Sequence, residues 1–171
     1  MKEEVILVDG YDHPIGTMEK LQAHRGGHLH RAISIILFNH QGEMLLQKRA
    51  KKKYHSGGLW SNACCSHPRP GEPTLDAAKR RTKEELGIDV ALSFAYSFIY
   101  KAALENNLTE HELDHVYIGY VDGDLQVNPD EIEDWKYLSV DRLKEDIRLQ
   151  PSHYTYWFKL IVSHNRLTLP L

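Results

Sequence analysis

Residues 71–88 read GEPTLDAAKRRTKEELGI, and this stretch predicts the most regular helix of the chain. A proline in the first turn suits a helix start, because its missing N–H would have no intrahelical partner there. Small or apolar residues then recur at spacings of three and four, at Leu75, Ala78, Thr82 and Leu86. Gly87 follows, as expected for a helix C-cap. We therefore predict a helix over 73–86 that packs this face on a core.

Outside this helix, extended and helical patterns alternate along the chain. Runs rich in apolar, β-branched or aromatic residues predict strands at 5–8, 32–38, 43–48, 90–100, 115–121 and 135–138. The turn residues 39–42 indicate a hairpin between the second and third of these runs. Further helices are expected at 17–24, 139–146 and 152–163, with Thr17, Ser139 and Ser152 as N-caps. This order predicts an α/β (α+β) fold in which a mixed β-sheet is sandwiched between helices.

Length and composition favour a single soluble domain over residues 1–171. The 171 residues of 19.8 kDa carry a net charge of −3, so the chain lacks the basic footprint of a nucleic-acid-binding protein. Its longest apolar runs are far shorter than the roughly 18 residues that a membrane span requires. The acidic start and the adjacent cysteines Cys64 and Cys65, a spacing unsuited to an unstrained disulfide, indicate a reducing compartment. We expect a cytoplasmic protein, monomeric or weakly dimeric, that binds neither nucleic acid nor membrane.

One cluster of reactive residue types runs from residue 59 into the helix. Arg81 and Glu85 lie one helical turn apart and could face a cleft, although a solvated ion pair has the same pattern. Cys65 and His67 could be catalytic or could be buried core residues. A zinc knuckle is not indicated, because only two thiols are present and they are adjacent.

A second cluster contains two carboxylates that share a face. Glu110 and Glu112 are two residues apart, so on an extended segment both point the same way. They would repel each other unless a cation or a shared proton holds them, yet a solvated strand edge also carries such pairs. Imidazoles from His24, His30 and His67 would complete a set suited to a divalent metal. With eleven histidines in the chain, composition alone does not establish this site.

Several motifs, in this order and at these intervals, resemble the type 1 isopentenyl-diphosphate isomerases of the Nudix superfamily. They are Thr17-Met18-Glu19-Lys20 with His24, Leu29-His30-Arg31, Trp60-Ser61-Asn62 with Cys65-Ser66-His67-Pro68, Arg80-Arg81 before Glu85-Leu86-Gly87, and Glu110-His111-Glu112. The similarity runs from about residue 4 to about residue 162 and implies a Nudix-type fold.

The Nudix box itself is degenerate. It keeps Glu72, Arg80, Glu84 and Glu85, but Ser66 replaces its first glycine. Arg81 stands where the family's hydrolases carry a glutamate that helps to bind catalytic magnesium. A cation at this position argues against diphosphate hydrolysis, and the isomerase branch shares the Arg-Arg departure.

The resemblance implies an enzyme of isoprenoid biosynthesis that interconverts isopentenyl and dimethylallyl diphosphate. One proton is added to the alkene and another is removed on the opposite face, by Cys65 and Glu112 in roles that exchange with direction. Trp157 would stabilise the carbocation-like intermediate, and Tyr100 would hydrogen-bond Glu112. As a core anchor of the last helix, Trp157 would follow the same pattern.

The resemblance also implies two metal positions and a diphosphate site. Mn²⁺, Mg²⁺ or Zn²⁺ would be bound by His24, His30, His67, Glu110 and Glu112. A second ion, Mg²⁺, would bridge Glu85 and the phosphate oxygens. The diphosphate would contact Lys20, Arg49, Lys53 and Arg81. Two alternatives stay open: a Nudix pyrophosphohydrolase of a nucleotide or prenyl diphosphate, and a non-catalytic diphosphate-binding module.

Overall fold

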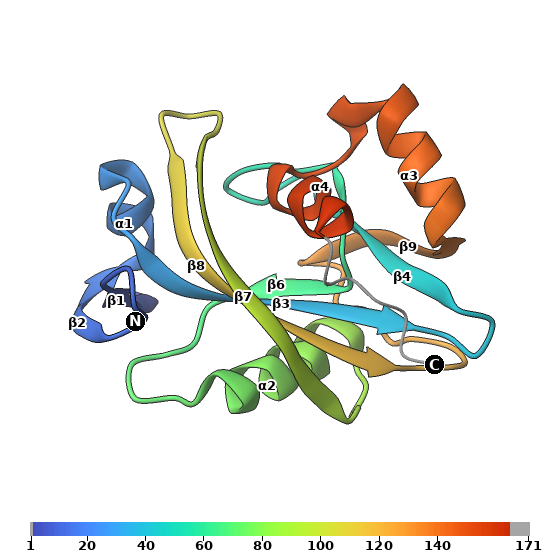
Figure 1. Ribbon diagram of the computed structural model, residues 1–171, viewed down its shortest axis with the longest axis horizontal. Helices are drawn as coiled ribbons and strands as arrows, with labels where there is room; N and C mark the ends of the chain where they lie inside the picture. The colour runs from blue at the N-terminus through green and yellow to red at the C-terminus, as the bar shows by residue number, and fades with distance from the viewer. Residues whose placement is uncertain (1, 165–171) are drawn as a thin grey trace.

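The central strand β3 (His30–Phe38) organises the sheet in the computed structural model, which describes residues 2–164 (Figure 1). Along one edge it pairs in parallel with β8 (Thr109–Tyr120), with His30 opposite Glu112. Along the other edge it pairs antiparallel with β6 (Cys64–Ser66), with Ser34 opposite Cys65. Residues far apart in the sequence are thereby placed on either side of one strand.

The remaining strands extend this core in both directions. β1 (Glu4–Val8) pairs with β2 (Pro14–Glu19) and touches β3 at one position, and β7 (Leu92–Ala103) pairs antiparallel with β8. β4 (Glu43–Arg49) meets β3 only at Phe38 and Met44, then pairs with β5 (Trp60–Ser61) and β9 (Ile132–Ser139). The helices are α1 (Lys20–Gly26), α2 (Thr74–Leu86), α3 (Val140–Leu149) and α4 (Tyr156–Ser163), with a 3₁₀ turn η1 (Pro151–His153) before α4.

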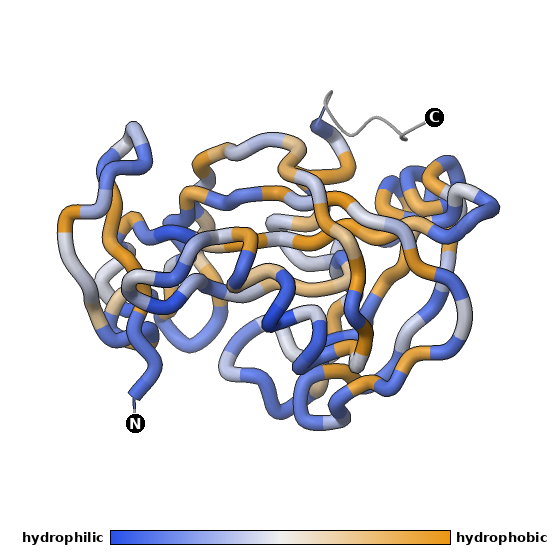
Figure 2. Tube along the Cα trace, turned by 90° about the horizontal axis from the view of Figure 1, so that it is seen from below, coloured by the Kyte–Doolittle hydropathy of each residue, from blue (hydrophilic) through white to orange (hydrophobic). Residues whose placement is uncertain are grey.

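Helices cover both faces of the sheet, α2 on one side and α3 with α4 on the other (Figure 1). Alternate residues of β3 serve the two layers: Ile33 and Ile35 pack with α2, while Ile36 packs with α4. Figure 2 shows that the turns around the lower edge of the molecule are mostly hydrophilic. Side chains alternate between the two faces along β6 as well. Cys64 is therefore buried on the α2 side, whereas Cys65 packs against the layer of α3 and α4.

The predicted fold class is confirmed: a mixed sheet lies between helices. The predicted helix over 73–86 is α2, whose C-cap Gly87 has the left-handed φ of 72° that glycine tolerates well. Ser139 caps α3 as predicted. Among residues 2–164, no helix is long and apolar enough to traverse a lipid bilayer.

Other element predictions were wrong. Thr17 is not an N-cap but lies in β2 opposite Ile6, and the helix begins at Lys20, where the Glu19 side chain accepts hydrogen bonds from two backbone N–H groups. Ser152 lies in η1, and Thr155 stands at the N-cap of α4. β8 begins six residues before the predicted strand, so it carries the whole cluster 109–114.

Candidate active site

A cavity opens beside β3, β6 and β8 and extends to the loop that joins β4 to β5. Its lining includes most of the residues expected at the site. They are Lys20, Arg49, Lys53, Cys65, His67, Arg81, Tyr100, Glu110, Glu112 and Trp157. Glu3, Ser34, Tyr54, His55 and Glu131 also line it.

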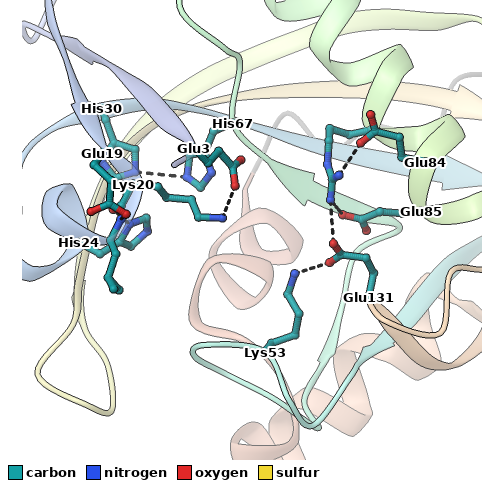
Figure 3. Close-up of polar contacts among 12 residues, drawn as sticks. Glu3, Glu19, Lys20, His24, His30, Lys53, His67, Glu84, Glu85 and Glu131 are labelled. Carbon is teal, nitrogen blue, oxygen red and sulfur yellow. Dashed lines mark hydrogen bonds and ion pairs between the residues drawn. The ribbon is translucent and has the colours of Figure 1, made fainter. Parts of the chain in front are cut away.

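Three imidazoles converge beside this cavity (Figure 3). His24 comes from α1, His30 from β3, and His67 from the segment after β6; all three are buried. Nδ1 of His24 lies 2.7 Å from the Lys20 carbonyl and Nδ1 of His30 lies 2.8 Å from the His28 carbonyl. A carbonyl only accepts, so each Nδ1 carries the proton and, in the neutral ring, Nε2 presents its lone pair to the centre.

Glu112 places one carboxylate oxygen among these nitrogens. Its Oε1 lies 3.6 Å from Nε2 of His24, 3.3 Å from that of His30 and 3.0 Å from that of His67. The four ligand atoms lie within 4.8 Å of one another. Nε2 of His24 is buried and has no hydrogen-bond partner in the described part of the chain. Buried lone pairs that face one another are favourable around a cation, so this donor set fits a divalent metal ion.

The protonation states also suit metal binding. Burial raises the pKa of Glu112, but the polar contacts with the three histidines outweigh burial and hold that pKa well below its ordinary value. Burial lowers the pKa of His67 to about 4. Burial also opposes protonation of His24, yet the nearby negative charge of Glu112 prevails and raises the pKa of His24. At neutral pH the group therefore offers an ionised carboxylate and at least one neutral imidazole.

Tyr100 links the two predicted carboxylates. Its hydroxyl lies 2.7 Å from Oε2 of Glu110 and 2.8 Å from Oε2 of Glu112, and it stands opposite Glu112 in the β7–β8 pair. Burial raises the pKa of Tyr100 well above its usual value, so the hydroxyl stays a donor. Glu110 is not in the four-residue group; its carboxylate belongs to a neighbouring set with His24 and His55.

Cys65 is held at the cavity by hydrogen bonds to neighbouring side chains, including those of Asn62 and Trp157. Its Sγ lies 3.0 Å from Oδ1 of Asn62, an acceptor for the S–H, and accepts the Trp157 indole N–H at 3.0 Å. The Asn62 amide donates to the carbonyls of Ile35 and Cys64, which fixes its oxygen toward the thiol. Burial raises the pKa of Cys65 to about 12, so the thiol is neutral and protonated.

Cations paired with carboxylates also line the cavity (Figure 3). Lys20, whose Nζ lies 2.6 Å from Glu3 Oε2, is beside the histidines, whereas Lys53 pairs with Glu131 at the other end. Arg81 contacts Glu84, Glu85 and Glu131 at 2.5, 2.6 and 3.3 Å. Arg49 donates to the His55 carbonyl and lies 5.2 Å from the Trp157 ring centroid. Basic groups of this kind are suited to a phosphate-bearing ligand.

Glu85 lies at this cationic end, apart from the histidine group. It is buried beside Arg81, and its Oε2 accepts a hydrogen bond of 3.1 Å from Gln47. Glu85 thus lies next to Arg81, one of the residues predicted to contact a diphosphate.

Sequence reasoning missed several lining residues, among them His55, which contacts Glu110, and Glu131, which pairs with Lys53 and Arg81. His55 follows a run of lysines in a loop, and Glu131 lies in an acidic segment. The pairing of β4 with β9 brings Glu131 next to Ala50 through a backbone hydrogen bond, and His55 is positioned by the loop between β4 and β5. Neither residue carries a periodic signal that could reveal this pairing.

Comparison with known proteins identifies the family to which this chain belongs. A NUDIX domain model matches residues 28–158. An isopentenyl-diphosphate Delta-isomerase of Pectobacterium atrosepticum is 52% identical over 92% of this chain and 88% of that protein, and one of Burkholderia multivorans is 46% identical over 100% and 96%. A crystal structure of a Deinococcus radiodurans protein superposes with a TM-score of 0.78 at 20% identity, over 93% of this chain and 97% of that one, which supports the fold. The chain belongs to the NUDIX domain family and, within it, to the isopentenyl-diphosphate Delta-isomerases.

Proposed function

We propose that this protein is a metal-dependent isomerase that interconverts isopentenyl diphosphate and dimethylallyl diphosphate in isoprenoid biosynthesis. The observation that carries the proposal is one cavity lined by the Cys65 thiol and the Glu112 carboxylate, beside a buried His/Glu group and a cluster of cations. We further propose a single domain over residues 1–171 that acts in the cytoplasm as a monomer or weak homodimer, without nucleic-acid or membrane partners.

Proton addition and removal need a donor and an acceptor in complementary states. Burial keeps the Cys65 thiol protonated, and the histidines keep Glu112 ionised. The two side chains come from β6 and β8, the strands that flank β3, and so reach the cavity from different sides. In one direction Cys65 protonates the alkene and Glu112 removes the second proton; in the reverse direction the roles exchange.

The intermediate of this reaction is a tertiary carbocation that water would capture. Trp157 is only 3% exposed, and its N–H is held by the Cys65 sulfur. Its ring therefore stays next to the reacting thiol, where an aromatic face stabilises positive charge by about 0.5–2 kcal/mol. The single hydrogen of the Tyr100 hydroxyl is shared between the carboxylates of Glu110 and Glu112, and this contact orients both.

Two metal ions are proposed. His24, His30, His67 and Glu112, with Glu110, would hold Mn²⁺, Mg²⁺ or Zn²⁺, and the lone pairs that converge among the first four support this assignment. When bound, such an ion would lower the basicity of Glu112 and fix its orientation. Mg²⁺ at Glu85 would accompany the diphosphate, whose contacts would be Lys20, Arg49, Lys53 and Arg81.

Incubation with isopentenyl diphosphate and either Mg²⁺ or Mn²⁺ is expected to yield dimethylallyl diphosphate, because the cavity holds a proton donor and a proton acceptor. Proton NMR of the mixture distinguishes the two isomers directly. Release of a monophosphate would instead indicate a pyrophosphohydrolase, and tight binding of the diphosphate without turnover would indicate a binding module. Either result, with metal bound and the protein folded, would refute the proposal.

The affinity of the His/Glu group for Mn²⁺ is expected to fall as pH is lowered from about 7.5 to about 5.5, since protons compete for the ligand nitrogen. The raised pKa of His24 favours its protonation as pH falls, while the lowered pKa of His67 keeps that ring neutral. The dissociation constant at each pH can be measured by competition with a chelator of known pH dependence. An affinity that stays constant over this range would show that His24 is not a ligand.

A further inference from the structure

A fourth imidazole, that of His55, lies at the cavity outside the proposed set of ligands. It belongs to the loop between β4 and β5, is only 3% exposed, and its Nε2 lies 3.1 Å from Oε1 of Glu110. We propose that His55 is a positioning residue that donates a hydrogen bond to Glu110 and aims this carboxylate at the metal group. The inference rests on the proposed function, because it assumes that Glu110 contributes to metal binding.

The hydrogen-bond partners of His55 define its tautomer. Oε2 of Glu110 already receives the Tyr100 hydroxyl, and Oε1, as a carboxylate oxygen, also accepts. Nε2 of His55 must therefore carry a hydrogen. Its Nδ1 then accepts from the Ser56 hydroxyl, 3.1 Å away. His24 and His30 hold the opposite tautomer, with the hydrogen on Nδ1 and the lone pair of Nε2 directed inward.

The tautomer decides whether His55 acts as a hydrogen-bond donor or as a metal ligand. The ligand atoms of His24, His55 and Glu110 also lie within 4.8 Å of one another, a spacing that would suit a second ion. However, His24 has only one nitrogen free, since its Nδ1 is bonded to the Lys20 carbonyl, and that nitrogen is shared with the four-residue group. With its hydrogen on Nε2, His55 has no lone pair toward this space. The geometry thus favours a hydrogen-bond donor to Glu110.

The loop holds His55 firmly in this position. The His55 carbonyl accepts a hydrogen bond of 3.2 Å from Arg49. Ser56 has a φ of 53°, a left-handed conformation that a serine adopts only when its surroundings impose it, and its N–H donates to Glu105 in the turn between β7 and β8. The imidazole packs edge-on against Trp157, with ring centroids 5.8 Å apart. These contacts from three parts of the chain pre-set the direction of the Nε2–H.

Both oxygens of Glu110 are therefore held by donors, Tyr100 on one side and His55 on the other. A carboxylate fixed in this way needs little reorganisation when an ion binds. Loss of such an outer-shell partner typically weakens metal binding by about 10- to 100-fold.

The test compares Mn²⁺ affinity in the full-length protein, wild type and variants, by electron paramagnetic resonance of the free ion and by chelator competition. His55→Leu is expected to weaken Mn²⁺ binding by about 10- to 100-fold, because it removes the donor and keeps an apolar side chain in the packing. His55→Gln is expected to recover most of this loss, since the glutamine amide carries an N–H near the position of Nε2. The matched exchanges His40→Leu and His40→Gln, at a side chain that is 84% exposed, should leave the affinity unchanged.

Each outcome decides the inference. Wild-type affinity in folded His55→Leu would overturn it, and so would equal loss in folded His55→Leu and His55→Gln, as expected of a ligand. Should His55→Leu fail to give a native circular dichroism spectrum, near-wild-type affinity in His55→Gln would support the inference and a weakened affinity would overturn it. Failure of the wild-type protein itself to bind Mn²⁺ would refute the metal site of the proposed function and His55 with it, which separates the two proposals.

Discussion

Cys65→Ala is expected to reduce kcat for interconversion of the two isopentenyl isomers by about 10²- to 10⁴-fold or more, the usual contribution of a positioned proton donor. Alanine has no proton to give or take, and the indole of Trp157 and the amide of Asn62 lose their shared partner. The protein should stay folded, because a small side chain is exchanged for a smaller one. Steady-state kinetics at saturating metal, with thermal unfolding as the test of folding, measures the effect.

Cys64→Ala is the matched control. Cys64 is buried on the α2 side of the sheet, away from the layer that Cys65 faces, so its removal should mainly lower stability slightly. The pair of variants therefore also tests the register of β6. If Cys64→Ala were inactive and Cys65→Ala active, the essential thiol would be Cys64, and our assignment of Cys65 would be wrong.

Glu112→Gln is expected to be equally severe. The amide cannot accept the substrate proton, which alone removes about 10²- to 10⁴-fold in rate. It also replaces the oxygen that lies among three imidazole nitrogens, where a charged ligand holds a cation far better than a neutral one. Turnover measured over a wide range of Mn²⁺ concentrations separates the two effects, because excess metal can restore only binding.

Glu145→Gln provides the corresponding control, since the same chemical change is made at an exposed position of α3. It should leave both kcat and Mn²⁺ affinity unaltered. Full activity of Glu112→Gln at saturating Mn²⁺ would remove Glu112 from the proton-transfer pair and leave it as a ligand only.

Local sequence signals were sufficient where structure depends on neighbours along the chain. The helix α2 follows from its proline, its apolar spacing and Gly87, all within 15 residues. The strand at residues 14–19 could not be predicted in this way. Pro14 and Gly16 weaken its strand pattern, and the strand is stabilised by pairing with β1. The predicted start of α4 was wrong as well, because Pro151 begins a 3₁₀ turn and not the helix itself.

In the candidate site, too, local sequence patterns predicted some features, whereas others depend on contacts between distant parts of the chain. The shared face of Glu110 and Glu112 could be predicted from a spacing of two. That His30 stands opposite Glu112 depends on the parallel pairing of strands about 80 residues apart, which no local pattern encodes. The resemblance to a family supplied these partners, but it did not indicate His55 or Glu131, whose roles depend on a loop and on the β4–β9 pair.

The cavity lining carries as many basic as acidic side chains. The basic ones are Lys20, Arg49, Lys53 and Arg81, and the acidic ones are Glu3, Glu110, Glu112 and Glu131. Of the proposed diphosphate contacts, Lys20 now pairs with Glu3, and Lys53 and Arg81 pair with Glu131. A diphosphate bound as proposed would displace these carboxylates and leave their negative charge uncompensated. A polyanion cannot enter such a low-dielectric space alone, because the electrostatic energy would rise steeply. For the proposed diphosphate contacts we therefore expect cations to enter together with the substrate, so that the ion–diphosphate complex binds in preference to the free anion.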